Sequence, residues 1–315
     1  MRTTLRSMLD LSPGMLAGAV AFALLIAPFA QDAKAGQADQ PPKGGTAQQQ
    51  GGQSGKPNLP TQGSAQTPAG PSAEESQAYQ AVNTEMAAGL DPDKVISLSE
   101  AFAQKYPNST LLSYIYTFEA SAYQQKGDAE KTVVAGEKSL KLKGDNLLAL
   151  IIMSSVLPQP QLMTGSDLDK QKRLTEAETD ANLALQLIEK VPKLPNEADD
   201  AYKKRRDGVA SEPHSALGMI HLQRAMMGLT GPDPEELAKA VQEYKTSVEI
   251  TDHPAPQNYY RLGEVYEHEN KIDDAIAAFS KASELSQGSP LQIYADKQVE
   301  DLKKKQAQSK PSSPK

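Results

Sequence analysis

Cysteine and tryptophan are absent from this chain, and phenylalanine occurs only five times in its 315 residues. Without cysteine the protein cannot form a disulfide, carry a lipid on an N-terminal cysteine or use a thiolate as a nucleophile. The shortage of large aromatic side chains excludes a core built mainly on aromatic packing. Helix-forming residues instead dominate from about residue 75 onward, which predicts an all-α protein.

The chain also lacks a strong excess of either charge. Its formal net charge is −7, with acidic and basic residues interspersed. This balance excludes the basic surface typical of a nucleic-acid-binding protein, so nucleic acid is not an expected partner. The lysine-rich run near the C-terminus is interpreted as a solvated helix end, where cations suit the negative end of the helix dipole.

The N-terminus has the features of an export signal. Arg2 and Arg6 precede an apolar run from Met15 to Ala30, and Ala33-Lys34-Ala35 has the small-x-small pattern of a signal-peptidase site. We therefore expect residues 1–35 to be a signal peptide that is removed after its last alanine, which makes the protein periplasmic or extracellular. The alternative is an uncleaved segment that anchors the chain in the inner membrane, although the run is shorter than the roughly 20 residues of a typical span.

The next segment, residues 36–72, consists mainly of Gly, Gln, Pro and Ser. It has too few apolar side chains to offset the entropy of ordering, so we expect a disordered linker that tethers the folded part. A short disordered tail is expected at residues 308–315.

Two short amphipathic patterns lie between residues 256 and 289. Leu262, Gly263 and Tyr266 share one helical face, and Ala275, Phe279 and Ala282 share another. Glycine and alanine leave room for two helix backbones to approach, beside the bulkier tyrosine and phenylalanine.

The segment from 256 to 289 closely resembles a tetratricopeptide (TPR) repeat, a helix–turn–helix unit of roughly 34 residues. One such unit cannot bury its apolar face alone, so the resemblance implies that further units stack beside it. It predicts a TPR-like solenoid of helical hairpins with right-handed superhelical curvature and a capping helix at the C-terminal end.

Further units follow from the same pattern. We expect them at about 74–107, 113–145, 147–192 and 211–253, before the unit at 256–289 and a cap at 290–307. Their repeat-signature packing residues are Tyr116, Ala120, Tyr123, Leu217, Gly218, Ala240 and Tyr244. The unit at 113–145 departs from the family pattern at Glu119, Thr132 and Gly136. Connections at 158–170 and 192–210 are longer than usual and are candidate binding loops, with solvated spacers as the alternative.

No catalytic or metal site is expected. His214 and His221 are seven residues apart, whereas metal-binding pairs on a helix are more often four apart, so His221 is interpreted as a packing residue. His253 and His268 have no partner at a suitable spacing. No nucleophile motif is present, and the glycine-rich stretches lie in the expected linker, so no cofactor is predicted.

Binding is the predicted activity. The resemblance implies that the first helix of each pair lines a concave groove that receives a protein or peptide partner. Side chains outside the packing positions are the candidate contacts: Tyr114, Thr117, Ser121, Gln124, Tyr260, Glu264, Glu267 and His268. The two glutamates would repel an acidic tail, so a neutral or basic partner segment is favoured.

The sequence thus predicts an exported, non-enzymatic scaffold that acts through protein–protein contact. Two alternatives stay open. One is an envelope-assembly or division adaptor, because residues 101–128 resemble the repeats of periplasmic outer-membrane assembly proteins. The other is a regulatory helical-repeat subunit of an enzyme complex. The identity of the partner does not follow from the residues.

Overall fold

The computed structural model describes residues 70–89, 91–228 and 230–309, and all the regular secondary structure in these ranges is helical. The expected signal peptide, most of the linker and the end of the tail lie outside these residues. The helices are α2 (Ala73–Ala88), α3 (Pro92–Lys105), α4 (Leu112–Gln125), α5 (Ala129–Leu142), α6 (Leu147–Val156), the short 3₁₀ helix η1 (Pro160–Leu162), α7 (Asp167–Ile188), α8 (Asp199–Met226), α9 (Pro234–Glu249), α10 (Pro256–His268), α11 (Ile272–Leu285) and α12 (Pro290–Ser309).

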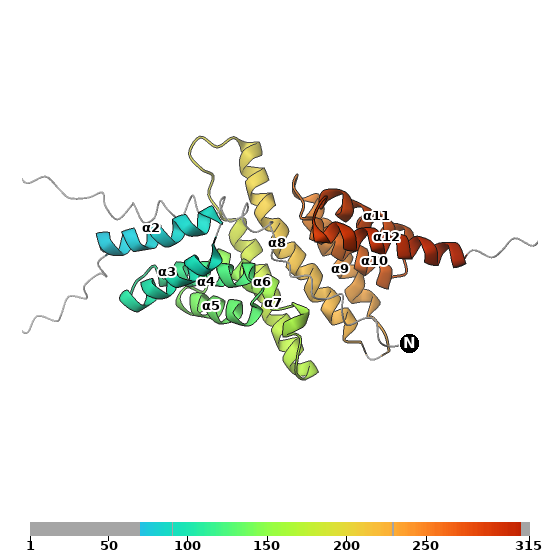
Figure 1. Ribbon diagram of the computed structural model, residues 1–315, viewed down its shortest axis with the longest axis horizontal. Helices are drawn as coiled ribbons and strands as arrows, with labels where there is room; N and C mark the ends of the chain where they lie inside the picture. The colour runs from blue at the N-terminus through green and yellow to red at the C-terminus, as the bar shows by residue number, and fades with distance from the viewer. Residues whose placement is uncertain (1–69, 90, 229, 310–315) are drawn as a thin grey trace, which may run out of the picture.

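The helices form a stack that follows the chain from one end of the molecule to the other (Figure 1). Each helix packs against the next one, so α2/α3, α4/α5, α6/α7, α8/α9 and α10/α11 are successive pairs. The first helices of these pairs also contact one another in a row, from α2 through α4, α6 and α8 to α10. We call this row of first helices the inner row.

Side-chain caps set the beginnings of several helices. The Ser72 hydroxyl accepts a hydrogen bond from the Glu75 N–H at 3.1 Å, and the Glu75 carboxylate accepts one from the Ser72 N–H at 3.3 Å. The sequence predicts both ends of α2, with Ser72 and Glu75 as a capping box and Gly89 as the stop, and the structure confirms them, since Gly89 is left-handed with a φ of 65°. Asp91, Asp128 and Asp233 cap α3, α5 and α9 in the same way.

Two glycines allow the helices of a pair to approach closely. A Cβ atom on Gly263 would lie 2.9 Å from the Phe279 ring, and a Cβ atom on Gly218 would lie 2.8 Å from the Tyr244 ring. Both rings are fully buried. Leu217-Gly218 and Leu262-Gly263 therefore have the same role. At each glycine, an aromatic ring from the second helix of the pair packs against the backbone of the first helix.

Helix α6 lies in the middle of the stack, as its nearly continuous apolar sequence predicts. Most of its residues are buried, and α7 packs along it with Ala177, Ala181 and Ile188 turned inward. Leu185, the remaining residue of the predicted packing stripe, is half-buried.

The charged joint at 192–210 differs most from the predicted units. The unit expected from residue 211 already begins at Asp199, because α8 continues through Pro213 in its interior. The charged stretch before residue 211 is thus an extension of the next helix, which is one of the two interpretations that its sequence allows, the other being a single helical turn. The N-terminal half of α8 is held by an ion pair between Arg205 and Glu197 at 2.8 Å, in which both side chains are at most one-tenth exposed.

The terminal helix α12 also presents a different face from the one expected. Leu291, Ala295 and Leu302 pack against the preceding pair, but Ile293 and Tyr294 are 72% and 43% exposed. The sequence pattern predicts that Ile293 and Tyr294 belong to the apolar face of this cap together with Leu291 and Leu302, and this prediction is wrong. The helix also runs two residues past the predicted end at 307.

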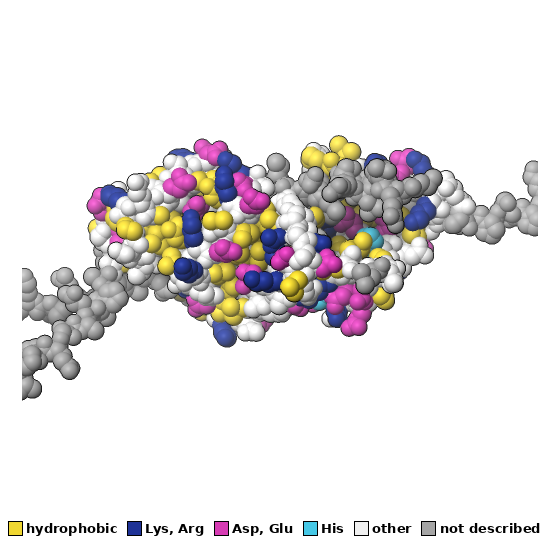
Figure 2. Space-filling model, turned by 90° about the horizontal axis from the view of Figure 1, so that it is seen from below, with side chains coloured by type: hydrophobic (Ala, Val, Ile, Leu, Met, Phe, Trp, Pro, Cys, Tyr) yellow, Lys and Arg dark blue, Asp and Glu magenta, His cyan; other side chains and the backbone are white. Residues whose placement is uncertain are grey.

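The visible surface carries charges of both signs. Figure 2 shows acidic and basic side chains interspersed, with hydrophobic side chains reaching the surface between them. Among the described helices, none is long and apolar enough to cross a membrane.

Candidate binding surface

A pocket of about 110 Å³ opens between helices of the inner row. Its walls come from α4, α6, the segment around η1, α8 and α10, with one ring from α9. The lining residues are Gln124, Ser155, Gln159, Pro160, Gln161, Glu212, Ser215, Ala216, Met219, Tyr244, Ala255, Gln257, Asn258 and Arg261. The pocket thus joins four successive pairs of the stack.

Hydrogen bonds between side chains connect the walls. Gln124 donates to the Ser155 hydroxyl at 3.0 Å and so joins α4 to α6. The Ser215 hydroxyl donates to the Asn258 side-chain carbonyl at 2.7 Å and joins α8 to α10. These contacts hold neighbouring pairs together while they keep the surface polar.

Three polar atoms of the pocket residues are buried without a hydrogen-bond partner among the residues that the structure describes. They are the Tyr244 hydroxyl, the Gln257 side-chain carbonyl oxygen Oε1 and the Asn258 amide nitrogen Nδ2. Tyr244 is fully buried and Asn258 is only 5% exposed. Burial raises the pKa of the Tyr244 hydroxyl well above its usual value, so this group stays neutral.

The pocket contains two charged residues in different situations. Arg261 donates to Glu264 at 2.8 Å, one turn along α10, so its charge is balanced. Glu212 is half-buried, and within the described part of the chain its carboxyl has no ion-pair or hydrogen-bond partner. Burial raises the pKa of this carboxyl above its ordinary value.

The structure buries three of the predicted groove residues. Thr117 is 1% exposed, Ser121 is 5% exposed and Tyr260 is 2% exposed. The prediction that these side chains reach the groove is wrong, because neighbouring helices cover this part of α4 and α10. Tyr260 packs against Phe279, with the ring centroids 5.0 Å apart.

Thr117 instead belongs to a buried polar cluster made with Ser113, Ser139 and Asn146. The Asn146 nitrogen Nδ2, which has two hydrogens to donate, lies 2.9 Å from the hydroxyl oxygens of Ser113 and Thr117 and 3.1 Å from that of Ser139. Thr117 also donates to the Ser113 carbonyl at 2.9 Å. The cluster joins α4, α5 and the start of α6, and the sequence reasoning missed it.

The other predicted groove residues keep some exposure. Tyr114, Gln124, Glu264 and Glu267 are half-buried, and His268 is exposed. Only Gln124 lines the pocket, and Glu264 contributes through Arg261. A binding role for these residues stays a prediction.

Most of the pocket was missed from the sequence. Glu212, Ser215 and Met219 recur every three or four residues on α8, as do Gln257 or Asn258 and Arg261 on α10. This spacing places each set on one helical face and could have indicated the pocket.

The predicted packing residues are mostly in the interior. Tyr116, Tyr123 and Tyr266 are half-buried and lie at the edge of the core. The remaining positions are buried, and they are Ala120, Leu217, Gly218, Ala240, Tyr244, Leu262, Gly263, Ala275, Phe279 and Ala282.

The two helical histidines each contact one glutamate. His214 lies 2.7 Å from Glu243, and His221 lies 2.8 Å from Glu236, both through Nδ1. Within the described ranges, no three His, Asp or Glu side chains are grouped closely enough to hold a metal ion.

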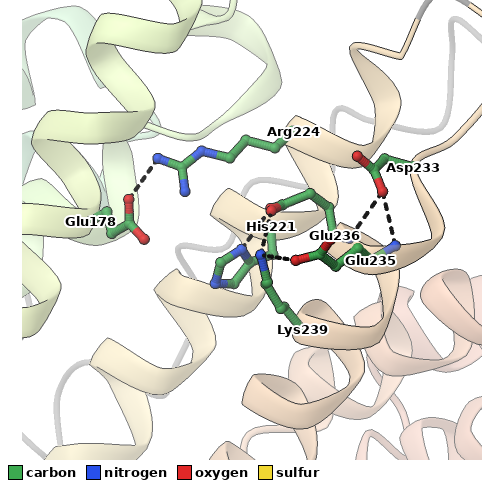
Figure 3. A network of polar contacts seen from close by, with 7 residues as sticks. All are labelled: Glu178, His221, Arg224, Asp233, Glu235, Glu236 and Lys239. Atoms are coloured by element: carbon green, nitrogen blue, oxygen red, sulfur yellow. Dashed lines mark hydrogen bonds and ion pairs between the residues drawn. The ribbon is translucent and has the colours of Figure 1, made fainter.

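Figure 3 shows the surroundings of His221, where polar contacts connect α7, α8 and α9. Glu236 also contacts Lys239 at 2.9 Å, and Arg224 reaches across to Glu178 at 2.6 Å. Burial alone would raise the pKa of Glu236, but the hydrogen bonds from His221 and Lys239 hold it below its usual value. The network stabilises the packing of α8 between its neighbours.

Comparison with solved structures identifies the fold. A thermophilic TPR protein from Thermus thermophilus aligns with a TM-score of 0.50 and 15% identity, over 71% of this chain and 98% of that protein. This chain has a TPR-like helical-repeat fold. A structure of residues 1–338 of an assembly chaperone of RpL4 (Acl4) aligns at a TM-score of 0.49 and 11% identity, over 76% of this chain and 92% of that one. No protein-family model and no curated protein sequence matches the chain.

Proposed function

We propose that this protein is a scaffold that binds a protein partner along its inner row and performs no catalysis itself. The observation that carries the proposal is the pocket with polar side chains in its walls, which is formed jointly by α4, α6, α8 and α10. A surface assembled from several repeats can follow an extended segment over a longer path than any one helix can.

The chemistry of the pocket suits a peptide. Carboxamide groups from Gln124, Gln257 and Asn258 offer both hydrogen-bond donors and acceptors, as a peptide backbone does. Such groups can recognise main-chain atoms irrespective of the sequence, and the charged residues then add selectivity. Recognition of a peptide by these hydrogen bonds needs no cofactor.

Export is the second part of the proposal. Residues 1–35 direct the chain across the membrane and are removed after Ala35, and residues 36–72 then tether the repeats to the new N-terminus. N-terminal sequencing of the exported protein checks this part, with Gly36 as the expected first residue. Recovery of Met1 or Arg2 at the terminus would refute cleavage.

Photocrosslinking in the native cell tests the partner-binding surface. A photoreactive amino acid replaces Gln161, an exposed residue at the pocket, or Gln186, an exposed residue on α7 that serves as the matched control. We expect a discrete protein adduct from position 161 and not from position 186, with the partner identified by mass spectrometry. Adducts at 186 alone, or none at either position, would contradict the proposal.

A further inference from the structure

The polar atoms left without partners in the pocket indicate what kind of group is missing. The Gln257 side-chain oxygen Oε1 requires a hydrogen-bond donor, whereas the Asn258 nitrogen Nδ2 requires an acceptor. Glu212 lines the same pocket with a half-buried carboxyl group, which accepts hydrogen bonds when it is ionised. The Tyr244 hydroxyl can serve as either a donor or an acceptor. Buried groups of this kind are costly unless they are satisfied, so a cluster of them around one pocket requires an explanation.

The charges of the pocket residues indicate which kind of partner group fits the pocket. Arg261 is already paired with Glu264, whereas Glu212 has no counter-charge among the described residues. The Glu212 carboxyl lines the pocket without a cation beside it, and burial raises its pKa. A positively charged partner group can pair with Glu212 when its carboxyl is ionised, whereas a partner carboxylate would be repelled by it.

The size of the pocket fits one side chain better than a whole helix. About 110 Å³ holds several water molecules, which can satisfy the polar atoms in the free protein, or the end of one long side chain. A guanidinium group presents five N–H donors in a planar fork, which pairs with a carboxylate through two parallel hydrogen bonds. The main chain that carries it adds a carbonyl oxygen, which is the acceptor that Asn258 lacks.

We propose that the pocket receives an arginine side chain from an extended partner segment, with its guanidinium on Glu212 and Gln257 and a main-chain carbonyl on Asn258. The arginine displaces the pocket water as it enters. This inference rests on the proposed function and adds to it the residue that the surface selects.

A synthetic peptide array tests the inference. Every arginine-containing peptide is paired with a counterpart in which citrulline, which has the same shape without the charge, replaces arginine. The probes are the full-length mature protein, its Glu212→Gln variant and a Glu130→Gln control at an exposed position on α5. Circular dichroism establishes that each variant is folded.

The wild-type protein and the control variant should bind arginine peptides about tenfold or more tightly than their citrulline counterparts, since hydrogen bonds to buried charges are lost in citrulline. Glu212→Gln should abolish that preference. If peptides bind but citrulline substitution has no effect, or if Glu212→Gln keeps the preference, the inference is overturned and the proposed function stands. If no peptide binds at all, the result contradicts both the proposed binding of a partner segment and the inferred selection of arginine.

Discussion

The close contact between Gly218 and the Tyr244 ring makes a quantitative prediction about stability. Adding a methyl group in Gly218→Ala would place Cβ at 2.8 Å from the buried ring, which is closer than carbon atoms approach in a packed core. Gly208 provides a matched control in the same helix, because a Cβ atom there would find its nearest neighbour, the Thr251 hydroxyl oxygen, at 3.9 Å.

Both substitutions replace a helical glycine with alanine, but only Gly218→Ala also overpacks the core. Replacing glycine with alanine inside a helix stabilises it by about 1 kcal/mol, since alanine loses less backbone entropy on folding. Overpacking a core by one methyl group costs about 1–3 kcal/mol. Gly208→Ala should therefore raise the free energy of unfolding by about 1 kcal/mol. Gly218→Ala should fall below that variant by the overpacking cost of about 1–3 kcal/mol.

Equilibrium unfolding in urea, followed by far-ultraviolet circular dichroism, measures both variants against the wild-type protein. Tyrosine fluorescence serves as a second probe, since the chain lacks tryptophan. Coincident transitions by the two probes establish that the free energies can be compared. The reasoning fails if both variants are stabilised equally, because Tyr244 would then move aside without cost.

Three further predictions concern the core and the ion pairs. Phe279→Ala should lower the free energy of unfolding by about 3–5 kcal/mol, because the ring is fully buried, and urea unfolding measures the change. Asn146→Ala should cost about 1–3 kcal/mol by leaving the buried hydroxyl cluster without its shared donor, whereas Asn182→Ala, at an exposed position, should have little effect in the same assay. The hydrogen bond from Arg205 lowers the pKa of Glu197 from 4.5 to about 2, so this pair contributes stability above the unfolded pKa and loses it as the pH falls toward about 2. Thermal unfolding measured against pH should show a smaller acid-induced loss in Glu197→Gln, and an unchanged pH profile would refute this assignment.

The helical hairpins were predictable because their signals are local. The Ser72 capping box, the Leu-Gly steps and the three- or four-residue recurrence of apolar positions each depend on neighbours within one or two turns. Such features fold in the same way wherever the hairpin lies, so sequence spacing was sufficient to place Phe279 in the core.

The candidate surface was much less predictable. Thr117 and Gln124 lie two turns apart on α4, and both were expected to face the groove. The structure buries Thr117 in the hydroxyl cluster and leaves Gln124 at the pocket. Which part of a helix is covered depends on the exact path of its neighbours, and one helix cannot encode that path.

The sequence by itself determined an all-helical stack of hairpins and the small residues at which an aromatic ring meets a backbone. These follow from hydrophobic periodicity and from the size of side chains a few residues apart. Only the tertiary structure decided that Glu212 of α8, Gln124 of α4 and Asn258 of α10 surround one pocket. The reason is physical: these residues belong to different repeats, and only the stacking of complete pairs brings their side chains together and removes the water around them.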